Sequence, residues 1–221
     1  MKIKILSIFI MCLMVMGAQA QIDRSKQPEA GPAPKINLGK PKTFKLKNGL
    51  QIMVVENHKL PRVSASLIID NKPNSEGNKV GVKSLYSSMM GNGTKSMSKE
   101  EFNEKVDFLG ASVGYGSASA YASSLSKFFP EVMELMADGL LNPLFTEEEF
   151  QDQKDRVLEG LKAGEKSASN IASNVSRKLA FGGNHPYGEF ETEESVNNVT
   201  LKDVKTYYNN FISPKNAYLV V

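Results

Sequence analysis

The chain has 221 residues, 27 of them basic and 24 acidic, with a formal net charge of +3 and a single cysteine. This length allows one large or two small domains with a real hydrophobic core, and the near-balanced charge does not indicate a nucleic-acid-binding protein. The cysteine, Cys12, lies in the N-terminal segment, so the rest of the chain is expected to fold without a disulfide.

The first 20 residues, MKIKILSIFIMCLMVMGAQA, have the pattern of a secretory signal peptide. Lys2 and Lys4 precede an apolar run, and Ala-Gln-Ala at 18–20 is a small-x-small cleavage pattern. A membrane anchor is the alternative, but the run is shorter than the roughly 20 residues that span a bilayer. Cleavage would leave 25 basic and 24 acidic residues, a net charge of +1, in a secreted, periplasmic protein that starts at Gln21.

Residues 21–41 are predicted to form a flexible tether, because they contain four prolines and few large apolar groups. Order is expected from residue 42 onward. The segment FKLKNGLQIMVVEN has two apolar-rich runs on either side of Asn48-Gly49, a dipeptide that supplies positive φ in tight hairpin turns. RVSASLIID, from residue 62, predicts a further strand, and a loop is expected over 71–79.

A helix is predicted over residues 82–90, because apolar side chains recur there at helical spacing. Gly91 and Gly93 can terminate it. Ser98 and Glu101 then form a capping-box pattern that predicts the start of a second helix, EEFNEKVDFLG. The apolar residues of the first helix are Val82, Leu85, Tyr86, Met89 and Met90.

Two strands are predicted over residues 111–129, ASVGYGSASAYASSLSKFF, which alternate and contain many small residues. Pro130 stands where the first turn of a helix tolerates proline, and Asn142-Pro143 ends that helix.

The remaining chain is predicted to be mostly helical, with one closing strand. Thr146 and Glu149 form a capping box before a long helix, a further helix covers about 169–181, and another begins after Thr200 with Asp203. The final residues, NAYLVV, read as a strand. These elements predict an α+β domain with a mostly antiparallel sheet packed against a layer of helices.

Ser84, Ser87 and Ser88 fall on one face of the first predicted helix, because positions three and four apart are neighbours on an α-helix. An inverted zinc-binding motif, His-x-x-Glu-His, needs this geometry, with two imidazoles on the metal and a glutamate that activates water. Serine hydroxyls cannot replace the two imidazoles as zinc ligands or the glutamate that activates water. Only His58 and His185 occur elsewhere, whereas a zinc site usually takes three or four ligands, so no catalytic zinc is expected in this chain.

The same serines are not expected to act as nucleophiles. A nucleophilic serine needs an adjacent base, and neither a G-x-S-x-G nor an S-x-x-K motif surrounds them. Lys83 lies on a different helix face from Ser84. We interpret the serines as small polar residues in the space that larger ligands would occupy.

Taken together, these segments resemble the insulinase or pitrilysin family of zinc peptidases. The resemblance runs from FKLKNGLQIMVVEN through GNGTKS, FLGASV, NPLFTEEEFQDQKDRVLEGL and NHPYG to SPKNAYLVV, and so covers nearly the whole predicted mature chain. It implies that residues 42–221 form the N-terminal peptidase-like domain of a family whose members carry two related domains. The chain is therefore expected to be the first half of a longer protein.

In catalytic members of that family, the segment before the Gly-Thr pair carries the two histidines and the glutamate, and a second glutamate in a VLEE-like helix completes the metal site. The resemblance places these positions at Ser84, Ser87, Ser88 and Gly160. The neighbouring Glu159 is turned about 100° away on a helix and is a poor substitute. A degenerate metal site is implied, with zinc expected only in a catalytic partner.

The stretch GASVGYGSASAY corresponds in the family to an edge strand beside the active site, which holds an extended peptide by backbone pairing. Val113, Gly114, Tyr115 and Gly116 are therefore predicted to contact a peptide, because such pairing needs an exposed edge and small side chains rather than reactive groups. A plain internal or protected strand is the alternative, and the sequence favours neither.

The resemblance implies a noncatalytic member that pairs with a homologous catalytic zinc peptidase subunit and helps to bind peptide substrates. One alternative is a structural or scaffolding subunit without peptide binding, and another is an unrelated binding module. Neither nucleic acid nor a stable membrane span after signal cleavage is expected.

Overall fold

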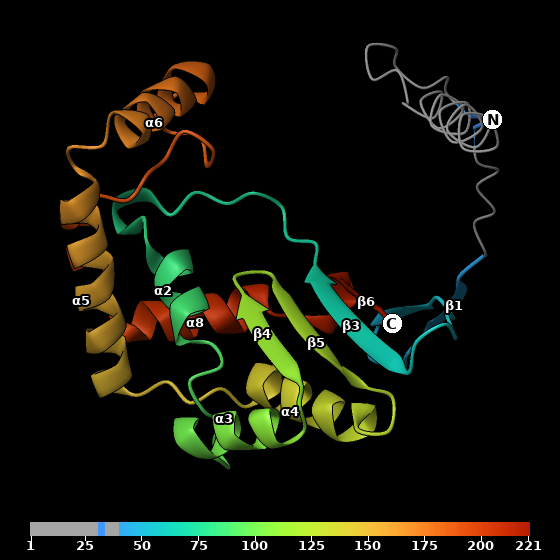
Figure 1. Ribbon diagram of the computed structural model, residues 1–221. Coiled ribbons are helices and arrows are strands. Elements are labelled where there is room, and N and C mark those ends of the chain that lie inside the picture. The colour runs from blue at the N-terminus through green and yellow to red at the C-terminus, as the bar shows by residue number, and fades with distance from the viewer. Residues whose placement is uncertain (1–30, 34–39) are drawn as a thin grey trace, which may run out of the picture. The chain divides into compact units, whose positions relative to one another are not determined.

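The structure is a computed structural model of the 221-residue chain, and it describes residues 31–33 and 40–221. The predicted signal peptide and nearly all of the predicted tether lie outside the described residues. From residue 40 onward the described chain belongs to one compact unit (Figure 1). Within the described ranges, no helix combines the length and the apolar character needed to cross a bilayer.

In the described part of the chain, six strands form one sheet. Their order across it is β1 (Lys42–Lys45), β2 (Gln51–Val54), β6 (Ala217–Val220), β3 (Arg62–Ile69), β5 (Ser119–Leu125) and β4 (Ser112–Gly116) (Figure 1). All neighbouring pairs are antiparallel except β2 and β6, which run parallel. The predicted, mostly antiparallel sheet is therefore confirmed, and its edges are β1 and β4.

The predicted hairpin is formed by β1 and β2, but its turn differs from the expected one. The Leu46 N–H donates to the Leu50 carbonyl at 2.9 Å, and Gly49 has φ +98°. Among the described residues only glycines have positive φ, so Asn48 does not. Its side-chain Oδ1 instead accepts from the Leu50 N–H at 3.1 Å. Positive φ is thus needed at Gly49 alone.

The helices follow the predicted order, with one addition. The short helix α7 was not predicted. In chain order the elements are η2 (Gly77–Lys79, a 3₁₀ turn), α2 (Val82–Met89), α3 (Lys99–Phe108), α4 (Phe129–Leu141), α5 (Glu147–Gly164), α6 (Ala168–Phe181), α7 (Glu193–Asn197), α8 (Leu201–Phe211) and η3 (Pro214–Asn216, a 3₁₀ turn).

The predicted capping box of α5 is only half formed. The Thr146 side chain accepts from the Glu149 N–H, as expected. The Glu149 side chain does not return this contact, because its Oε1 accepts from Asn92 Nδ2 at 2.7 Å instead and so ties α5 to the loop after α2. Reciprocal capping boxes do begin α3 (Ser98, Glu101) and α8 (Thr200, Asp203), as predicted.

An apolar core lies between the sheet and the helices. Helix α4 packs against β4 and β5, and α2 packs against α5 and α8. Tyr86 of α2 is fully buried in a cluster of aromatic rings that α8 and the segment before α5 complete. The largest fully buried side chains are Tyr86, Leu85, Met89, Val132, Val196, Val199 and Val204.

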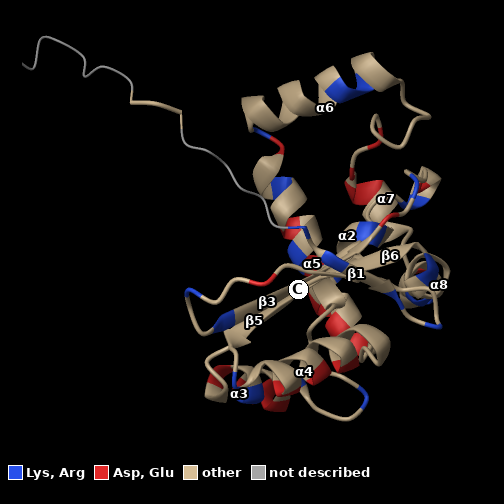
Figure 2. Cartoon of the chain, turned by 90° about the vertical axis from the view of Figure 1, so that its right-hand side faces the viewer, with Lys and Arg blue, Asp and Glu red and all other residues tan. Residues whose placement is uncertain are grey.

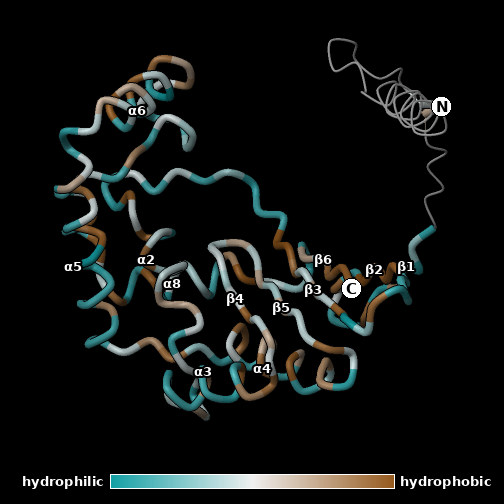
Figure 3. Tube along the Cα trace, in the orientation of Figure 1, coloured by the Kyte–Doolittle hydropathy of each residue, from teal (hydrophilic) through white to brown (hydrophobic). Residues whose placement is uncertain are grey.

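Two surfaces differ in character from the core. Helix α6 contains both hydrophobic and hydrophilic residues (Figure 3), and none of them is buried. Its apolar side chains Ile171, Val175 and Leu179 are at least half exposed. Helices α3 and α4 together carry seven acidic and two basic residues (Figure 2). These two helices therefore do not offer a surface for a polyanion.

Candidate functional site

Helix α2 places three serines on the side that faces away from the core. Ser84, Ser87 and Ser88 are half-buried, whereas Leu85 and Tyr86 between them are fully buried. The three serines therefore share one face of a real helix, as the spacing indicated. Ser88 Oγ donates to the Leu85 carbonyl at 3.1 Å, a common local bond for a helical serine.

The first turn of α2 is capped by a carboxylate from outside the helix. The N-cap residue, Gly81, has no side chain to accept from the free N–H groups. Glu76 Oε2 accepts instead from the N–H groups of Gly81 at 3.0 Å and Lys83 at 3.2 Å. Glu76 therefore fixes the start of the helix that carries the serines, and negative charge there is also favoured by the helix dipole.

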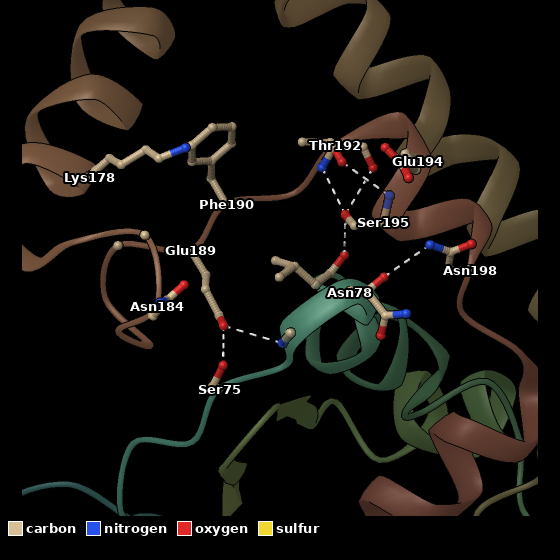
Figure 4. A pocket seen from close by; sticks show the side chains of 14 residues that line it. Ser75, Asn78, Lys178, Asn184, Glu189, Phe190, Thr192, Glu194, Ser195 and Asn198 are labelled. Atoms are coloured by element: carbon tan, nitrogen blue, oxygen red, sulfur yellow. Dashed lines mark hydrogen bonds between the residues drawn. The ribbon is translucent and has the colours of Figure 1, made fainter.

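Glu189, in the segment after NHPYG, binds the turn that carries Glu76, and Figure 4 shows its side chain directed at Ser75 and the start of η2. Its Oε2 accepts from the Glu76 N–H at 2.9 Å, and its Oε1 accepts from the Gly77 N–H at 3.2 Å and from the Ser75 hydroxyl. Partial burial raises the pKa of Glu189, but these donors outweigh it and hold the pKa below its usual value. The role of this segment is therefore to position α2.

The unpredicted helix α7 anchors the same segment from the other side. Ser195 Oγ donates to the Val80 carbonyl at 2.7 Å, and Asn198 Nδ2 donates to the Asn78 carbonyl at 3.2 Å (Figure 4). A side chain at Gly81 would place its Cβ 2.9 Å from Val196 Cγ2, and the positive φ at this position also favours glycine. Residues 75–81 are thus held from two directions.

Gly160, the fourth position that the resemblance assigns to a metal ligand, lies exposed on α5. An added Cβ there would meet nothing within 4 Å. Gly160 borders a cavity of about 290 Å³, whose lining includes Glu191 and two asparagines of α6, Asn170 and Asn174. A second cavity of about 430 Å³ is lined by these three residues and by Glu76. Glu191 therefore borders both cavities.

The carboxylate of Glu191 lies beside Ser84, and no sequence motif singles this residue out. Burial raises the pKa of Glu191, hydrogen bonding to the Ser84 side chain lowers it, and the Glu76 carboxylate raises it again. The balance leaves the pKa above its usual value. Ser84, which the resemblance assigns to the position of a metal-binding histidine, is thus next to an acidic side chain from a different segment.

A cavity of about 570 Å³ lies between η2, the segment before α7 and α7 itself (Figure 4). Most of its polar groups already bond to one another: Glu189 with Ser75, and Ser195 and Asn198 with backbone carbonyls. Neither histidine nor cysteine lines it. It offers no nucleophile with an adjacent base. The residues that line it instead hold the segment before α2 in place.

The residues at the four positions that the resemblance assigns to metal ligands do not fit zinc. They are three serines and a glycine, which supply neither the imidazole nor the carboxylate donors that zinc sites use. Within residues 31–33 and 40–221, no group of three or more His, Cys, Asp or Glu side chains is placed to hold a metal ion. His58 and His185 are exposed, and His185 stacks on Phe181. We therefore assign no reaction step to a metal in this chain.

Strand β4, which contains the four predicted peptide-contacting residues, is an edge strand. It pairs only with β5 in the described sheet, so one side of its backbone has no strand partner there. The side chain of Tyr115 does not face a peptide. Its hydroxyl donates toward the Leu135 and Met136 carbonyls of α4 at 3.3 and 3.1 Å. Val113, Gly114, Tyr115 and Gly116 therefore offer a backbone edge rather than a set of side chains.

Two glycines make room for the Tyr115 ring. A Cβ at Gly91, just after α2, would lie 2.9 Å from Tyr115 Cδ2, and a Cβ at Gly139 of α4 would lie 2.1 Å from the Tyr115 hydroxyl oxygen. The ring is thus inserted between the end of α2 and α4, and it ties the edge strand to the helix that carries the serines.

The sequence profile of the insulinase family, peptidase family M16, matches residues 52–187. The chain is 23% identical to YmxG, an uncharacterized zinc protease of Bacillus subtilis (strain 168), over 187 residues that cover 81% of this chain and 46% of that protein. It is 25% identical to mitochondrial-processing peptidase subunit beta of Mus musculus over 196 residues, which cover 84% and 40%. The chain therefore spans less than half the length of these relatives.

Solved structures show the same fold. A protease from Helicobacter pylori superimposes with a TM-score of 0.73 at 22% identity, over 82% of this chain and 45% of that one. A peptidase M16 inactive domain from Pseudomonas fluorescens gives a TM-score of 0.72 at 23% identity, over 82% and 46%. These structural likenesses establish the fold, and the profile match over more than half of the sequence shows that the chain belongs to the insulinase family, peptidase family M16.

Proposed function

We propose that this chain is a noncatalytic member of the family that pairs with a homologous zinc peptidase subunit and helps to hold peptide substrates. One observation carries the proposal: Ser84, Ser87, Ser88 and Gly160, the positions that the resemblance assigns to the metal ligands, carry no group able to bind zinc, in a chain that has the family fold. The helix face that would bind and activate water has no group able to do so. A scaffold of this kind can bind a peptide but lacks the means to cut it.

The edge strand supports a peptide-holding role. Pairing with an extended peptide requires free backbone N–H and C=O groups along one strand, and β4 has them on its outer side in the described sheet. Its residues are small except for Val113 and Tyr115, and the Tyr115 ring is turned inward. A peptide could approach this edge closely.

The proposed partner is supported by one of the relatives. Mitochondrial-processing peptidase subunit beta is by its name one subunit of a larger enzyme. A chain of the same family without metal ligands is well suited to pair with a subunit that has them. The structural neighbour described as an inactive M16 domain is consistent with this division of roles.

The zinc and activity of the purified chain test the noncatalytic role. The chain alone is expected to contain substoichiometric zinc after dialysis against zinc-containing buffer, and to leave unfolded peptides intact. Stoichiometric zinc together with peptide cleavage by the chain alone would refute the proposal. A family zinc peptidase with an intact motif serves as the positive control for both assays.

Hydrogen exchange tests the peptide-holding role, and the sheet supplies its own control. A saturating unfolded peptide is expected to slow amide exchange in β4, residues 112–116, because pairing protects backbone N–H groups. The opposite edge strand, β1, should exchange at an unchanged rate. The measurement is made on the chain alone and with a copurified catalytic partner.

A scaffolding subunit without peptide binding is the second candidate. The exposed apolar side chains of α6, Ile171, Val175 and Leu179, favour it, because an unpaired apolar helix face suits a large protein interface. Unchanged exchange at both sheet edges in the presence of peptide, with intact partner binding, would select this role.

We also propose that the protein is secreted to the periplasm. The proposal rests on the signal-peptide pattern of residues 1–20, which lie outside the described residues. Cell fractionation with N-terminal sequencing should recover the protein in the periplasm, starting at Gln21. Recovery of the full chain in the membrane fraction would favour the anchor.

A further inference from the structure

We propose that the β1–β2 hairpin binds the surface of an anionic phospholipid membrane, with its lysines against the headgroups and two apolar side chains at the boundary with the acyl chains. This inference goes beyond the proposed peptidase-related function and does not depend on it. The surface concerned, called the hairpin patch below, consists of Lys42, Phe44, Lys45, Leu46, Lys47 and Lys215.

Positive charge is concentrated in and around this hairpin. Residues 40–62 contain six basic residues and one acidic residue, a net charge of +5, whereas residues 63–221 contain 16 basic and 21 acidic residues, a net charge of −5. The one acidic residue of the first segment, Glu56, is paired with Lys42. Because the charges are separated in this way, a negatively charged surface would attract the hairpin and repel the rest of the molecule.

The lysines beside the turn have no counter-charge in the described part of the chain. Lys45, Lys47 and Lys215 are exposed, and none forms an ion pair within 4.0 Å with a described carboxylate. Lys215, in η3, joins the other two at the turn, where its Cα lies 3.3 Å from the position that a Cβ on Gly49 would take. The fold therefore adds a cation from a distant segment to those of the hairpin.

Exposed apolar side chains stand between these lysines. Phe44 of β1 is 50% exposed and Leu46, directly after β1, is 42% exposed, at one edge of the sheet. Lysine on an edge strand also prevents pairing with other sheets. That role explains neither the exposed apolar side chains nor Lys215, which is not on the strand. Cationic and apolar side chains together on one exposed element are typical of proteins that bind at the surface of a bilayer.

The form of the hairpin patch favours a bilayer over a folded protein partner. None of residues 40–62 lines any of the three cavities described above, so these cavities give the hairpin no recess for a side chain of a partner. All cations of the patch are lysines, which carry a compact charge on a flexible stem, whereas arginine suits contacts of fixed, bidentate geometry. A bilayer presents many equivalent phosphate groups without a fixed geometry, and each lysine near an anionic surface strengthens the attraction.

Vesicle binding by the predicted mature chain, residues 21–221, tests the proposal. This form lacks the apolar segment 1–20 but keeps the whole compact unit that is described from residue 40 onward. It is expected to sediment with vesicles of phosphatidylcholine and phosphatidylglycerol in equal parts, less so as salt is added, and not with vesicles of phosphatidylcholine alone. Failure to bind the anionic vesicles, or equal binding to both kinds, would overturn the proposal.

A matched pair of double variants tests the position of the contact. Lys45→Gln with Lys47→Gln is expected to weaken binding to the anionic vesicles by roughly thirtyfold, because each lysine near the surface contributes about fivefold. Lys162→Gln with Lys166→Gln changes the net charge equally on α5 and just after it, on the opposite side of the described unit from β1 (Figure 1), and should retain the affinity. Equal losses in both double variants would overturn the hairpin patch as the binding surface. Binding of polyglutamate without binding of vesicles would overturn the membrane in favour of an acidic protein partner.

The apolar part of the contact is tested by fluorescence, because the chain contains no tryptophan. Phe44→Trp is expected to shift its emission to shorter wavelength when anionic vesicles are added, since residue 44 would enter the interface. Phe108→Trp, on α3 at a position where the phenylalanine is 86% exposed, should show no shift. Circular dichroism checks that both variants are folded. A shift at residue 108 instead of residue 44, or at neither while the vesicles are bound, would overturn the proposed contact.

Discussion

Tyr86 and Tyr208 lie in the same aromatic cluster with ring centroids 6.3 Å apart, but their hydroxyl groups differ in hydrogen bonding. The Tyr208 hydroxyl donates toward the Leu140 and Leu141 carbonyls, each at 3.0 Å. The Tyr86 hydroxyl is fully buried and has no hydrogen-bond partner among the described residues. Burial also raises the pKa of Tyr86, so the hydroxyl stays protonated and must lose its water without compensation.

Replacement of each tyrosine by phenylalanine should therefore have opposite consequences. Tyr86→Phe is expected to leave the free energy of unfolding unchanged or to raise it by up to about 1 kcal/mol, because it removes an unpaired polar group. Tyr208→Phe should lower it by about 1 kcal/mol, because two carbonyls lose their donor. Urea unfolding followed by circular dichroism measures both. Equal losses in the two variants would mean that Tyr86 has a partner.

Two helical glycines provide a second matched pair. Gly139→Ala would bring a Cβ within 2.1 Å of the Tyr115 hydroxyl oxygen, and it is expected to lower the free energy of unfolding by about 1–3 kcal/mol through overpacking. Gly160→Ala adds a methyl group in open space on an exposed helix surface, and should raise it by about 0.5–1 kcal/mol. Helix propensity favours alanine in both, so the difference isolates the contact with Tyr115. Stabilisation by both changes would show that Tyr115 lies elsewhere.

Local signals in the sequence were sufficient for most of the fold. A helix start is specified by residues three apart, so Ser98 and Glu101 predicted α3 without tertiary information. Helix α7 was missed because its five residues contain one large apolar side chain, Val196, and so show no helical period. The incomplete capping box at Thr146 could not be predicted from neighbouring residues either, because the Glu149 side chain bonds to a residue 57 positions away.

The site shows the same division between local and distant information. The serine face of α2 follows from spacing alone, because a helix fixes which positions are neighbours. The contacts that support this helix do not follow from spacing. Glu189 bonds to Glu76 across 113 positions, and no pattern in either segment indicates the contact. The direction of the Tyr115 side chain could not be predicted either, because alternation in a strand does not show which face is buried.

The ion pair between Lys79 and Asp203 should make the stability of the segment before α2 depend on pH. Burial raises the pKa of Asp203, but Lys79 and Thr200 outweigh it and hold the pKa below its usual 3.8. The folded state therefore binds the proton less readily than the unfolded state. This contribution is fully present above the usual carboxyl range and is lost as pH falls through the lowered value.

Asp203→Asn is accordingly expected to be less stable than the wild type near neutral pH, with a difference that shrinks as the pH falls below about 3.8. Urea unfolding at a series of pH values measures this. Asp152→Asn, an exposed change on α5, is the control and should leave the acid dependence unaltered. A pH-independent difference for Asp203→Asn would contradict the ionised carboxylate as the source of this stability.

Restoring two ligands tests whether the serine face retains the geometry of a metal site. Ser84→His with Ser88→His places imidazoles four positions apart on α2, and this double variant is expected to bind zinc measurably where Ser84→His alone does not. Competition with a chromophoric zinc chelator measures the affinity. Zinc bound equally well by the single variant would place the metal outside the predicted pair.

Addition of Gly160→Glu to the double variant then tests the fourth position. Two imidazoles fall short of the three or four ligands that protein zinc sites use, so a carboxylate at 160 is expected to tighten zinc binding by roughly tenfold or more. Glu159, already present next to it, is an internal control, because a helix turns successive residues about 100° apart. Gly160→Ala in the same background separates the added carboxylate from the gain in helix propensity. If glutamate and alanine at 160 gave equal affinity, α5 would not present this position to the serine face, and the assignment of Gly160 as a lost ligand would be wrong.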